Sequence, residues 1–226
     1  MAHLIWLHGF GSSPQTTQKG VRLQDELSWS IASIPDLEGG DFEHLTIDLW
    51  IQRAKDAVAA LPDDGVPLVL AGSSLGAYTA ALIASQGVVG TRPHALFLVA
   101  PAFGFTGRWE ALLGPKGIEE WHRTGWRTFD HKVHIQRRLH VGFLDSCLKL
   151  PQIPPPVSIP VSILHGRHDQ TAEWKLALEW SVQCPRGEFS LLEAAHGISG
   201  EGHLNYLGIA ARRLVARLEG LDERER

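Results

Sequence analysis

The sequence predicts an α/β protein in which helices cover both faces of a mainly parallel sheet of about six strands. Short apolar runs alternate along the chain with longer stretches of helical periodicity, which is the pattern of consecutive βα units. Several of the apolar runs are nearly continuous, as expected for strands that are buried on both faces. With 226 residues, the chain has a suitable length for one domain of this kind.

The elements can be placed in order along the chain. The candidate strands are short aliphatic runs at residues 4–7, 30–34, 68–71, 95–99, 161–164 and 189–192. The candidate helices are the amphipathic or alanine-rich stretches at residues 17–27, 48–61, 75–85, 172–182 and 204–218. The charged end of the chain, residues 222–226, is expected to fray.

One region interrupts this alternation. Between Phe103 and Pro160 there is no clean strand, but three tryptophans, Trp109, Trp121 and Trp126, gather there. A connection of this length inside a compact domain is usually functional or contains helices of its own. We therefore predict a single domain over residues 1–226 with a helical cap inserted at residues 104–150, followed by a proline-rich linker at 151–160.

The composition excludes several classes of function. The formal net charge of −4 provides no basic surface for nucleic acid or an anionic membrane. No run approaches the ~18 apolar residues of a membrane span, and the first apolar run is too short for the core of a signal peptide. The two cysteines, Cys147 and Cys184, do not make a disulfide framework. We expect a cytoplasmic protein with no membrane span and no nucleic-acid partner; its oligomeric state is not predicted.

The segment Gly72-Ser73-Ser74-Leu75-Gly76 lies between a candidate strand and a candidate helix. This is the G-x-S-x-G nucleophile elbow in the context that it requires, a strand, a sharp turn and a helix. An ordinary βα turn is the alternative, since small residues are common in loops. The context favours Ser74 as a nucleophile.

A serine nucleophile needs a base and a group that orients the base. His196 follows the last candidate strand directly, whereas the rival His203 lies close to the final helix, where a surface or capping role is ordinary. Asp169 follows the strand at 161–164; it could cap the next helix, but Thr171 could do so equally well. The resulting order, Ser74, Asp169 and His196, is that of α/β-hydrolases.

Two backbone amides are expected to stabilise an oxyanion. One is the amide of Leu75, which follows the nucleophile at a helix N-terminus. The other comes from the turn after the first strand, with Phe10 as the first choice and Gly11 as the second. His8 is expected to brace this turn by a hydrogen bond.

These motifs together resemble the α/β-hydrolase superfamily. The run Leu-His-Gly-Phe-Gly-Ser-Ser-Pro at residues 7–14, Lys19 after it, and Val-Ala-Pro-Ala at 99–102 are similar to the small bacterial YqiA-like esterases. The resemblance implies a cofactor-free esterase, thioesterase or related acyl hydrolase with a small-molecule acyl substrate. Gly11 and the long loop after His196 depart from that group, so the substrate preference stays open.

The main hypothesis is a serine hydrolase that cleaves a carboxylic ester or thioester through an acyl-enzyme on Ser74. Trp109, Trp121 and Trp126 would then wall the substrate pocket, although such aromatic residues could also simply bury the cap. The alternative is a catalytically silent hydrolase-fold protein that binds a ligand or acts as a scaffold.

A metal hydrolase is a further alternative, because the cap contains His131, His134 and His140, and His165 and His168 lie near Asp169. Metal sites usually need further ligands in fixed relation, and none is evident. We expect His131 and His134 to lie on the solvated face of a cap helix. No metal and no cofactor are predicted, since neither G-x-x-x-x-G-K nor G-x-G-x-x-G occurs.

Overall fold

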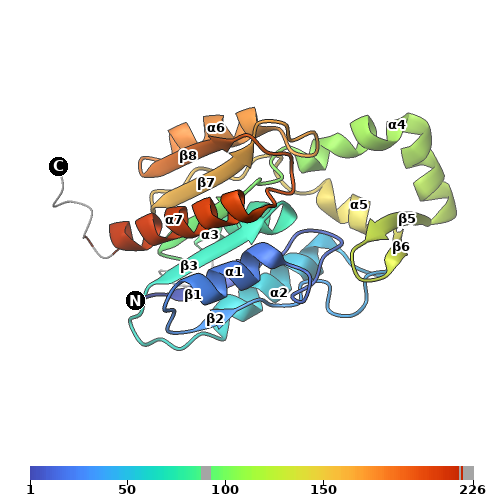
Figure 1. Ribbon diagram of the computed structural model, residues 1–226. Helices are drawn as coiled ribbons and strands as arrows, with labels where there is room; N and C mark the ends of the chain where they lie inside the picture. The colour runs from blue at the N-terminus through green and yellow to red at the C-terminus, as the bar shows by residue number, and fades with distance from the viewer. Residues whose placement is uncertain (88–92, 219, 221–226) are drawn as a thin grey trace.

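The computed structural model describes residues 1–87, 93–218 and 220; the charged end expected to fray, 222–226, lies outside the described residues. Its main sheet has six strands, all parallel (Figure 1). In spatial order these are β2 (Ala32–Ser33), β1 (His3–Leu7), β3 (Leu68–Ser73), β4 (Ala95–Val99), β7 (Val161–Gly166) and β8 (Gly187–Leu192). The predicted parallel sheet is confirmed.

The four central strands of the sheet are buried on both faces, which explains why they read as nearly continuous apolar runs. Along β1, Ile5 and Leu7 belong to one hydrophobic core, whereas Leu4 and Trp6 belong to the other. The first core is covered by α2 (Ile47–Ala59), α3 (Leu75–Gln86) and α6 (Trp174–Gln183), and the second by α1 (Gln18–Glu26) and α7 (Glu201–Leu218), which lie in front of the sheet in Figure 1. All five predicted helices are present, with ends shifted by a few residues.

The insertion between β4 and β7 differs from the prediction. It contains α4 (Phe105–Thr124), an antiparallel hairpin of β5 (Trp126–His131) and β6 (Ile135–His140), and α5 (Gly142–Cys147). The prediction of a purely helical cap is therefore wrong over the hairpin. Because β6 reads Ile-Gln-Arg-Arg-Leu-His and buries only Leu139, it lacks the apolar alternation from which a strand is recognised.

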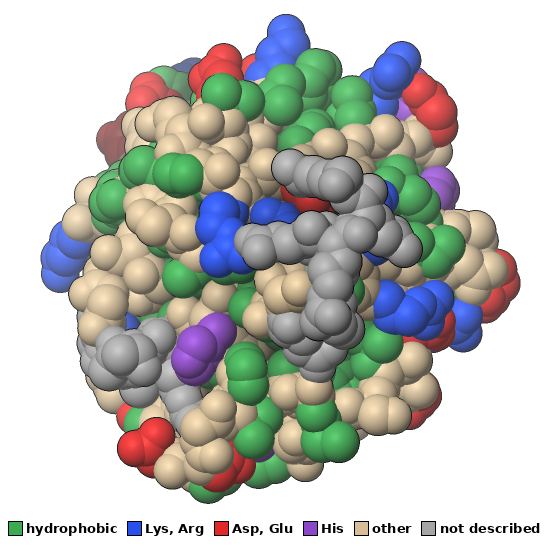
Figure 2. Space-filling view, turned by 90° about the vertical axis from the view of Figure 1, so that its left-hand side faces the viewer, with side chains coloured by type: hydrophobic (Ala, Val, Ile, Leu, Met, Phe, Trp, Pro, Cys, Tyr) green, Lys and Arg blue, Asp and Glu red, His purple; other side chains and the backbone are tan. Residues whose placement is uncertain are grey.

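The insertion lies beyond the carboxyl ends of the parallel strands, at the right of Figure 1. The opposite face, at the amino ends of the strands, is shown in Figure 2; among its described residues, acidic and basic side chains are interspersed with apolar ones. None of the helices in the described ranges is both long and apolar enough to cross a membrane.

Candidate active site

Ser74 occupies a strained turn between β3 and α3. Its φ of 56° and ψ of −119° are rare for a residue with a side chain and are typical of a functional site. The backbone is packed so closely around this turn that Gly72 and Gly76 have no room for a side chain. A Cβ on Gly76 would lie 2.1 Å from the carbonyl oxygen of Leu7, and one on Gly72 would lie 2.6 Å from the carbonyl carbon of Gly76. The two glycines of the motif are therefore required by close approach.

The structure brings the three predicted polar residues into one hydrogen-bonded chain. The Oγ atom of Ser74 lies 3.0 Å from Nε2 of His196, and Nδ1 of His196 lies 2.7 Å from Oδ2 of Asp169. The carboxylate can only accept, so His196 carries its proton on Nδ1 and presents Nε2 to the serine as an acceptor. The Asp169 side chain is fully buried, whereas that of His196 is 26% exposed. In this arrangement Nε2 of His196 can accept the proton of the Ser74 hydroxyl.

Asp169 also organises its own loop. Its Oδ1 accepts hydrogen bonds from the amides of Thr171 and Ala172, both at 2.8 Å. The expectation that Thr171 could cap the next helix is wrong, because α6 begins only at Trp174 with Glu173 as its N-cap. Oδ1 of the carboxylate thus holds the loop, and Oδ2 faces His196.

His165, which the sequence suggested only as a possible metal ligand, is a further neighbour of Asp169. Its Nε2 lies 3.1 Å from Oδ2 of Asp169 and 3.3 Å from the carbonyl oxygen of Ala172, so it must donate. Burial acts to raise the pKa of Asp169, but the hydrogen bonds from His165, His196 and the Ala172 amide outweigh it and hold this pKa well below its usual value. In the sequence, this contact is indicated by the four-residue spacing of His165 and Asp169 within the His-Gly-Arg-His-Asp segment.

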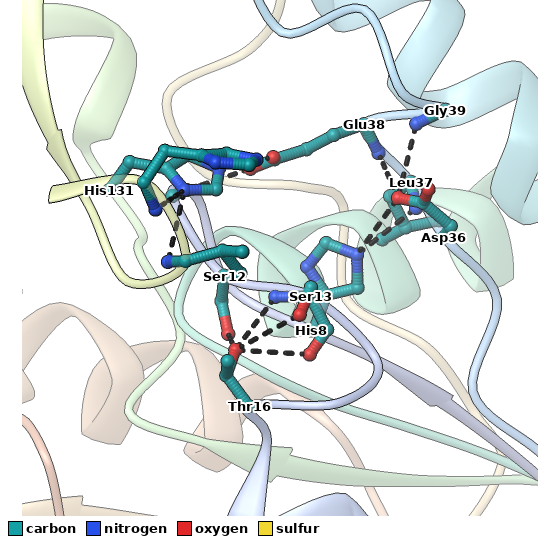
Figure 3. Close-up of polar contacts among 12 residues, drawn as sticks. His8, Ser12, Ser13, Thr16, Asp36, Leu37, Glu38, Gly39 and His131 are labelled. Atoms are coloured by element: carbon teal, nitrogen blue, oxygen red, sulfur yellow. Dashed lines mark hydrogen bonds and ion pairs between the residues drawn. The ribbon is translucent and has the colours of Figure 1, made fainter. Parts of the chain in front are cut away.

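The turn after β1 is held in a defined orientation by His8. Its Nδ1 donates to the carbonyl oxygen of Gly9 at 3.0 Å, and its Nε2 accepts from the amide of Leu37 at 3.0 Å (Figure 3). Burial lowers the pKa of His8, in keeping with a neutral ring that uses one nitrogen as donor and the other as acceptor. Because a trans peptide directs its C=O and N–H to opposite sides, the grip on Gly9 also fixes the direction of the Phe10 N–H.

A cavity of about 290 Å³ opens beside Ser74. Its walls are mainly apolar and come from both the sheet edge and the insertion: Phe10, Leu75, Ala102, Phe105, Trp109, Leu112, Phe129 and Phe143. Of the three predicted pocket tryptophans, only Trp109 lines this cavity. Trp121 is buried behind it, with its ring 5.7 Å from that of Trp109. Trp126 packs instead against His140 and Arg138, so the pocket assignments of Trp121 and Trp126 are wrong.

A second, more polar cavity of about 660 Å³ borders the first, and Gln170 lines both. Arg108 lines both cavities, and its guanidinium donates to the carbonyl oxygens of Gln170 and Thr171. The insertion is thereby tied to the loop that carries Asp169.

The remaining histidines have other partners. His203 lies in the first turn of α7. Its Nδ1 atom is 2.7 Å from the carbonyl oxygen of Ser199, whereas Ser74 is paired with His196. His131 is buried and bonded to Glu38, so the expectation that it lies on the solvated face of a cap helix is wrong. Among the described residues, no group of three or more His, Cys, Asp or Glu side chains is arranged to hold a metal ion.

Solved structures of α/β hydrolases share this fold over almost the whole chain. Est1E from Butyrivibrio proteoclasticus, solved with ferulic acid bound, has 20% identity and a TM-score of 0.78, with 97% of this chain and 90% of that chain covered. Alpha/beta hydrolase domain-containing protein 10 from mouse has 21% identity and a TM-score of 0.75, with 96% and 90% covered. A type II thioesterase of the yersiniabactin pathway has 18% identity and a TM-score of 0.59, with 94% and 92% covered.

At these identities the similarity establishes the fold alone. Among curated protein sequences, none matches this chain. The family described as "Uncharacterised protein family (UPF0227)" matches residues 3–178, which is most of the chain. The chain therefore belongs to the UPF0227 family, and it has the α/β-hydrolase fold.

Proposed function

We propose that the protein is a serine hydrolase that cleaves a carboxylic ester or thioester through an acyl-enzyme on Ser74. The observation that carries this proposal is the continuous hydrogen-bonded chain from Ser74 through His196 to Asp169, which opens on an apolar cavity. The wider conclusion, hydrolase chemistry, is also supported by the esterase and thioesterase structures that share the fold.

In the proposed reaction, His196 takes the proton of Ser74 as Oγ attacks the carbonyl carbon of the substrate. The oxyanion that forms is stabilised by the amides of Phe10 and Leu75. His196 then gives the proton to the leaving alcohol or thiol, and the acyl group stays on Ser74. Water, deprotonated by the same histidine, attacks the acyl-enzyme and releases the acid, and the serine recovers its proton.

The distribution of hydrogen bonds supports this choice of oxyanion donors. The amide of Gly11, the alternative donor, is already bonded to Glu38 at 3.0 Å. Within the described part of the chain, the amides of Phe10 and Leu75 donate to no other group. The Leu75 amide also lies at the N-terminus of α3, where the helix dipole favours negative charge.

The cavity beside Ser74 supports a compact acyl group. Its volume of about 290 Å³ is at the small end of the range for ligand sites, roughly 300–1,000 Å³. Five aromatic side chains contribute to its walls, which suits an aromatic or short aliphatic acyl group. Est1E, which shares the fold, binds the aromatic ferulic acid. The insertion would act as the cap over this group, and the polar cavity beyond Gln170 would receive the leaving group.

A fluorophosphonate probe tests the proposal directly. We expect the wild-type protein to be labelled and the Ser74→Ala variant not to be. Assays with p-nitrophenyl esters of graded chain length, beside acyl thioesters, then identify the preferred leaving group. Failure to label the folded wild type would contradict the proposed hydrolase activity and favour the alternative, a catalytically silent binding protein.

A further inference from the structure

The turn that carries Phe10 is held from two distant parts of the chain. The segment between β2 and α2 contributes Leu37 and Glu38, and the β5–β6 hairpin contributes His131 and Lys132. Figure 3 shows Glu38 extended toward His131, with Leu37 and His8 below it in the view. The hairpin of the insertion and the turn after β1 are therefore parts of one polar network.

Glu38 is the bridge in this network. Its Oε1 accepts from the amide of Gly11 at 3.0 Å, and its Oε2 accepts from Nε2 of His131 at 2.8 Å. The two side chains are only 6% and 3% exposed. Burial raises the pKa of Glu38, and the hydrogen bonds from His131 and Gly11 oppose this effect. A buried carboxylate is costly unless it is well provided with donors, so the bridge constrains all its partners.

His131 can make this contact in one tautomer only. Its Nδ1 accepts from the amides of Val133 at 3.2 Å and His134 at 3.3 Å, so the proton is on Nε2, facing Glu38. The ring is thus fixed to the hairpin turn by one nitrogen and to Glu38 by the other.

The hairpin also contacts the backbone of the turn directly. The amide of Lys132 donates to the carbonyl oxygen of Gly11 at 2.9 Å. Gly11 has a φ of +66°, and a Cβ there would lie 3.0 Å from the carbonyl oxygen of Asp130. A glycine at this position therefore lets the hairpin approach closely.

We propose that Glu38 is a positioning residue for the proposed reaction, which sets the orientation of the Phe10 amide and makes that orientation depend on the docking of the cap hairpin. The peptide that carries the Phe10 N–H is held by the hydrogen bond from His8 to the carbonyl oxygen of Gly9. The next peptide is held by the hydrogen bond from the amide of Gly11 to Glu38. Planar peptides leave little freedom between these two anchors. The inference rests on the proposed function, because it assumes that the Phe10 amide stabilises an oxyanion.

The first test is the Glu38→Ala variant, assayed per active site counted with the fluorophosphonate probe. Loss of a whole oxyanion donor costs about 10²–10³ in kcat, so a misaligned one should cost roughly 10- to 100-fold. We expect KM to change by less than about threefold and the affinity for a trifluoromethyl ketone, which forms a tetrahedral oxyanion on the serine, to fall as kcat falls. A merely structural role would reduce the number of labelled sites and leave kcat per site unchanged.

Two substitutions of His131 separate the bridge from the turn. In His131→Gln the amide nitrogen takes the place of Nε2 and can still donate to Glu38. In His131→Asn the amide oxygen takes the place of Nδ1 and can still accept from the hairpin turn, but no donor reaches Glu38. We expect His131→Gln to keep most of the kcat and His131→Asn to lose as much as Glu38→Ala. The reverse order would overturn the proposal, even if Glu38→Ala did not fold.

Asp64→Ala is the matched control. Asp64 lies 3.1 Å from Nε2 of His3, a carboxylate–histidine contact at the amino ends of the strands, far from Ser74. Its loss should lower stability and leave kcat per labelled site unchanged. An active, labelled wild type with unchanged kcat in Glu38→Ala overturns this inference alone, whereas an unlabelled, inactive wild type overturns the proposed function as well.

Discussion

Oδ2 of Asp169 lies 3.1 Å from Nε2 of His165, and the same oxygen receives His196 at 2.7 Å. The carboxylate therefore has an imidazole donor besides the one that the proposed reaction uses. With the amides of Thr171 and Ala172 on Oδ1, the buried side chain is fully provided with donors. This surplus of donors explains why the pKa of Asp169 is held low despite its burial.

The first prediction concerns the pH dependence of stability. Because the pKa of Asp169 is lower in the folded protein than its unfolded value of about 3.9, its stabilising contribution is complete above that value and is lost as the pH falls toward the folded pKa. We expect urea unfolding to show a difference between wild type and Asp169→Asn that is constant above about pH 5 and shrinks below about pH 4. A difference that stays constant down to pH 3 would contradict the lowered pKa.

The second prediction concerns the hydrogen-bonded chain itself. Ser74→Ala or His196→Ala should lower kcat by about 10⁴–10⁶, and the double variant should be little worse than either, because the two residues act as a unit. His203→Ala is the control, since His203 contacts the carbonyl oxygen of Ser199 rather than Ser74. Steady-state kinetics with one activated ester suffices. An inactive His203→Ala beside an active His196→Ala would show that the base is wrongly assigned.

Several parts of the site could be predicted because each has a local signature. Ser74 lies in a G-x-S-x-G turn, and Asp169 and His196 each follow a recognisable apolar strand. In a parallel sheet the carboxyl ends of all strands meet at one edge, so three strand ends predict one site. The distances that make the residues a hydrogen-bonded chain depend on side-chain packing across 122 residues of sequence and could not be read locally.

The rest of the site depends on contacts without a local pattern. Glu38 lies in an irregular segment before α2, and its partners are far away in sequence, at Gly11 and His131. The hairpin was missed because its second strand is mostly polar. Trp121 and Trp126 have the same residue type as Trp109, and only the folded insertion distinguishes the one that lines the cavity. Composition can indicate an aromatic cap, but it cannot say which ring faces the substrate.

The third prediction concerns Lys19, whose Nζ donates to the carbonyl oxygen of Gly197, next to His196, at 2.5 Å. Burial, with the charge of Lys132 as the smaller cause, lowers the pKa of Lys19 to about 8. Its amine is therefore neutral and reactive above about pH 8, whereas ordinary lysines need about pH 10.4. Trace acetylation followed by mass spectrometry should give a midpoint near pH 8, which Lys132→Ala should raise. A midpoint close to 10 in the wild type would contradict the lowered pKa.

The fourth prediction concerns the backbone of the hairpin. Ile135 has a φ of +63° and is 85% exposed, so a β-branched residue occupies the left-handed region without burying its side chain. That conformation costs roughly 1–2 kcal/mol for most residues, and Asn tolerates it better. Ile135→Asn should therefore raise the free energy of unfolding by about 1 kcal/mol, as measured with urea. The control Val133→Asn, in the same turn but without a positive φ, should give no gain; equal effects would refute strain as the cause.

Trp109 separates the cavity beside Ser74 from another cavity in the insertion. This cavity, distinct from the polar cavity at Gln170, has a volume of about 450 Å³. It lies near the kink of α4, where Gly114 is non-helical and Pro115 follows. Trp109 lines both cavities. Its ring is held 6.0 Å from Phe129 and 6.0 Å from Phe143, so it closes the far end of the proposed acyl pocket.

The fifth prediction is that Trp109→Ala joins the two cavities and lengthens the acyl chain that the protein accepts. Each methylene that is newly buried contributes about 0.8 kcal/mol, so two more should favour the longer ester by roughly 15-fold. The measurement is the ratio of kcat/KM for hexanoyl and butanoyl p-nitrophenyl esters, which differ by two methylenes. Trp126→Ala is the matched control, because Trp126 packs on Arg138 and His140 and does not line either cavity; its ratio should equal that of the wild type. An unchanged ratio in Trp109→Ala, with the protein folded and labelled at Ser74, would show that the acyl group does not extend toward Trp109.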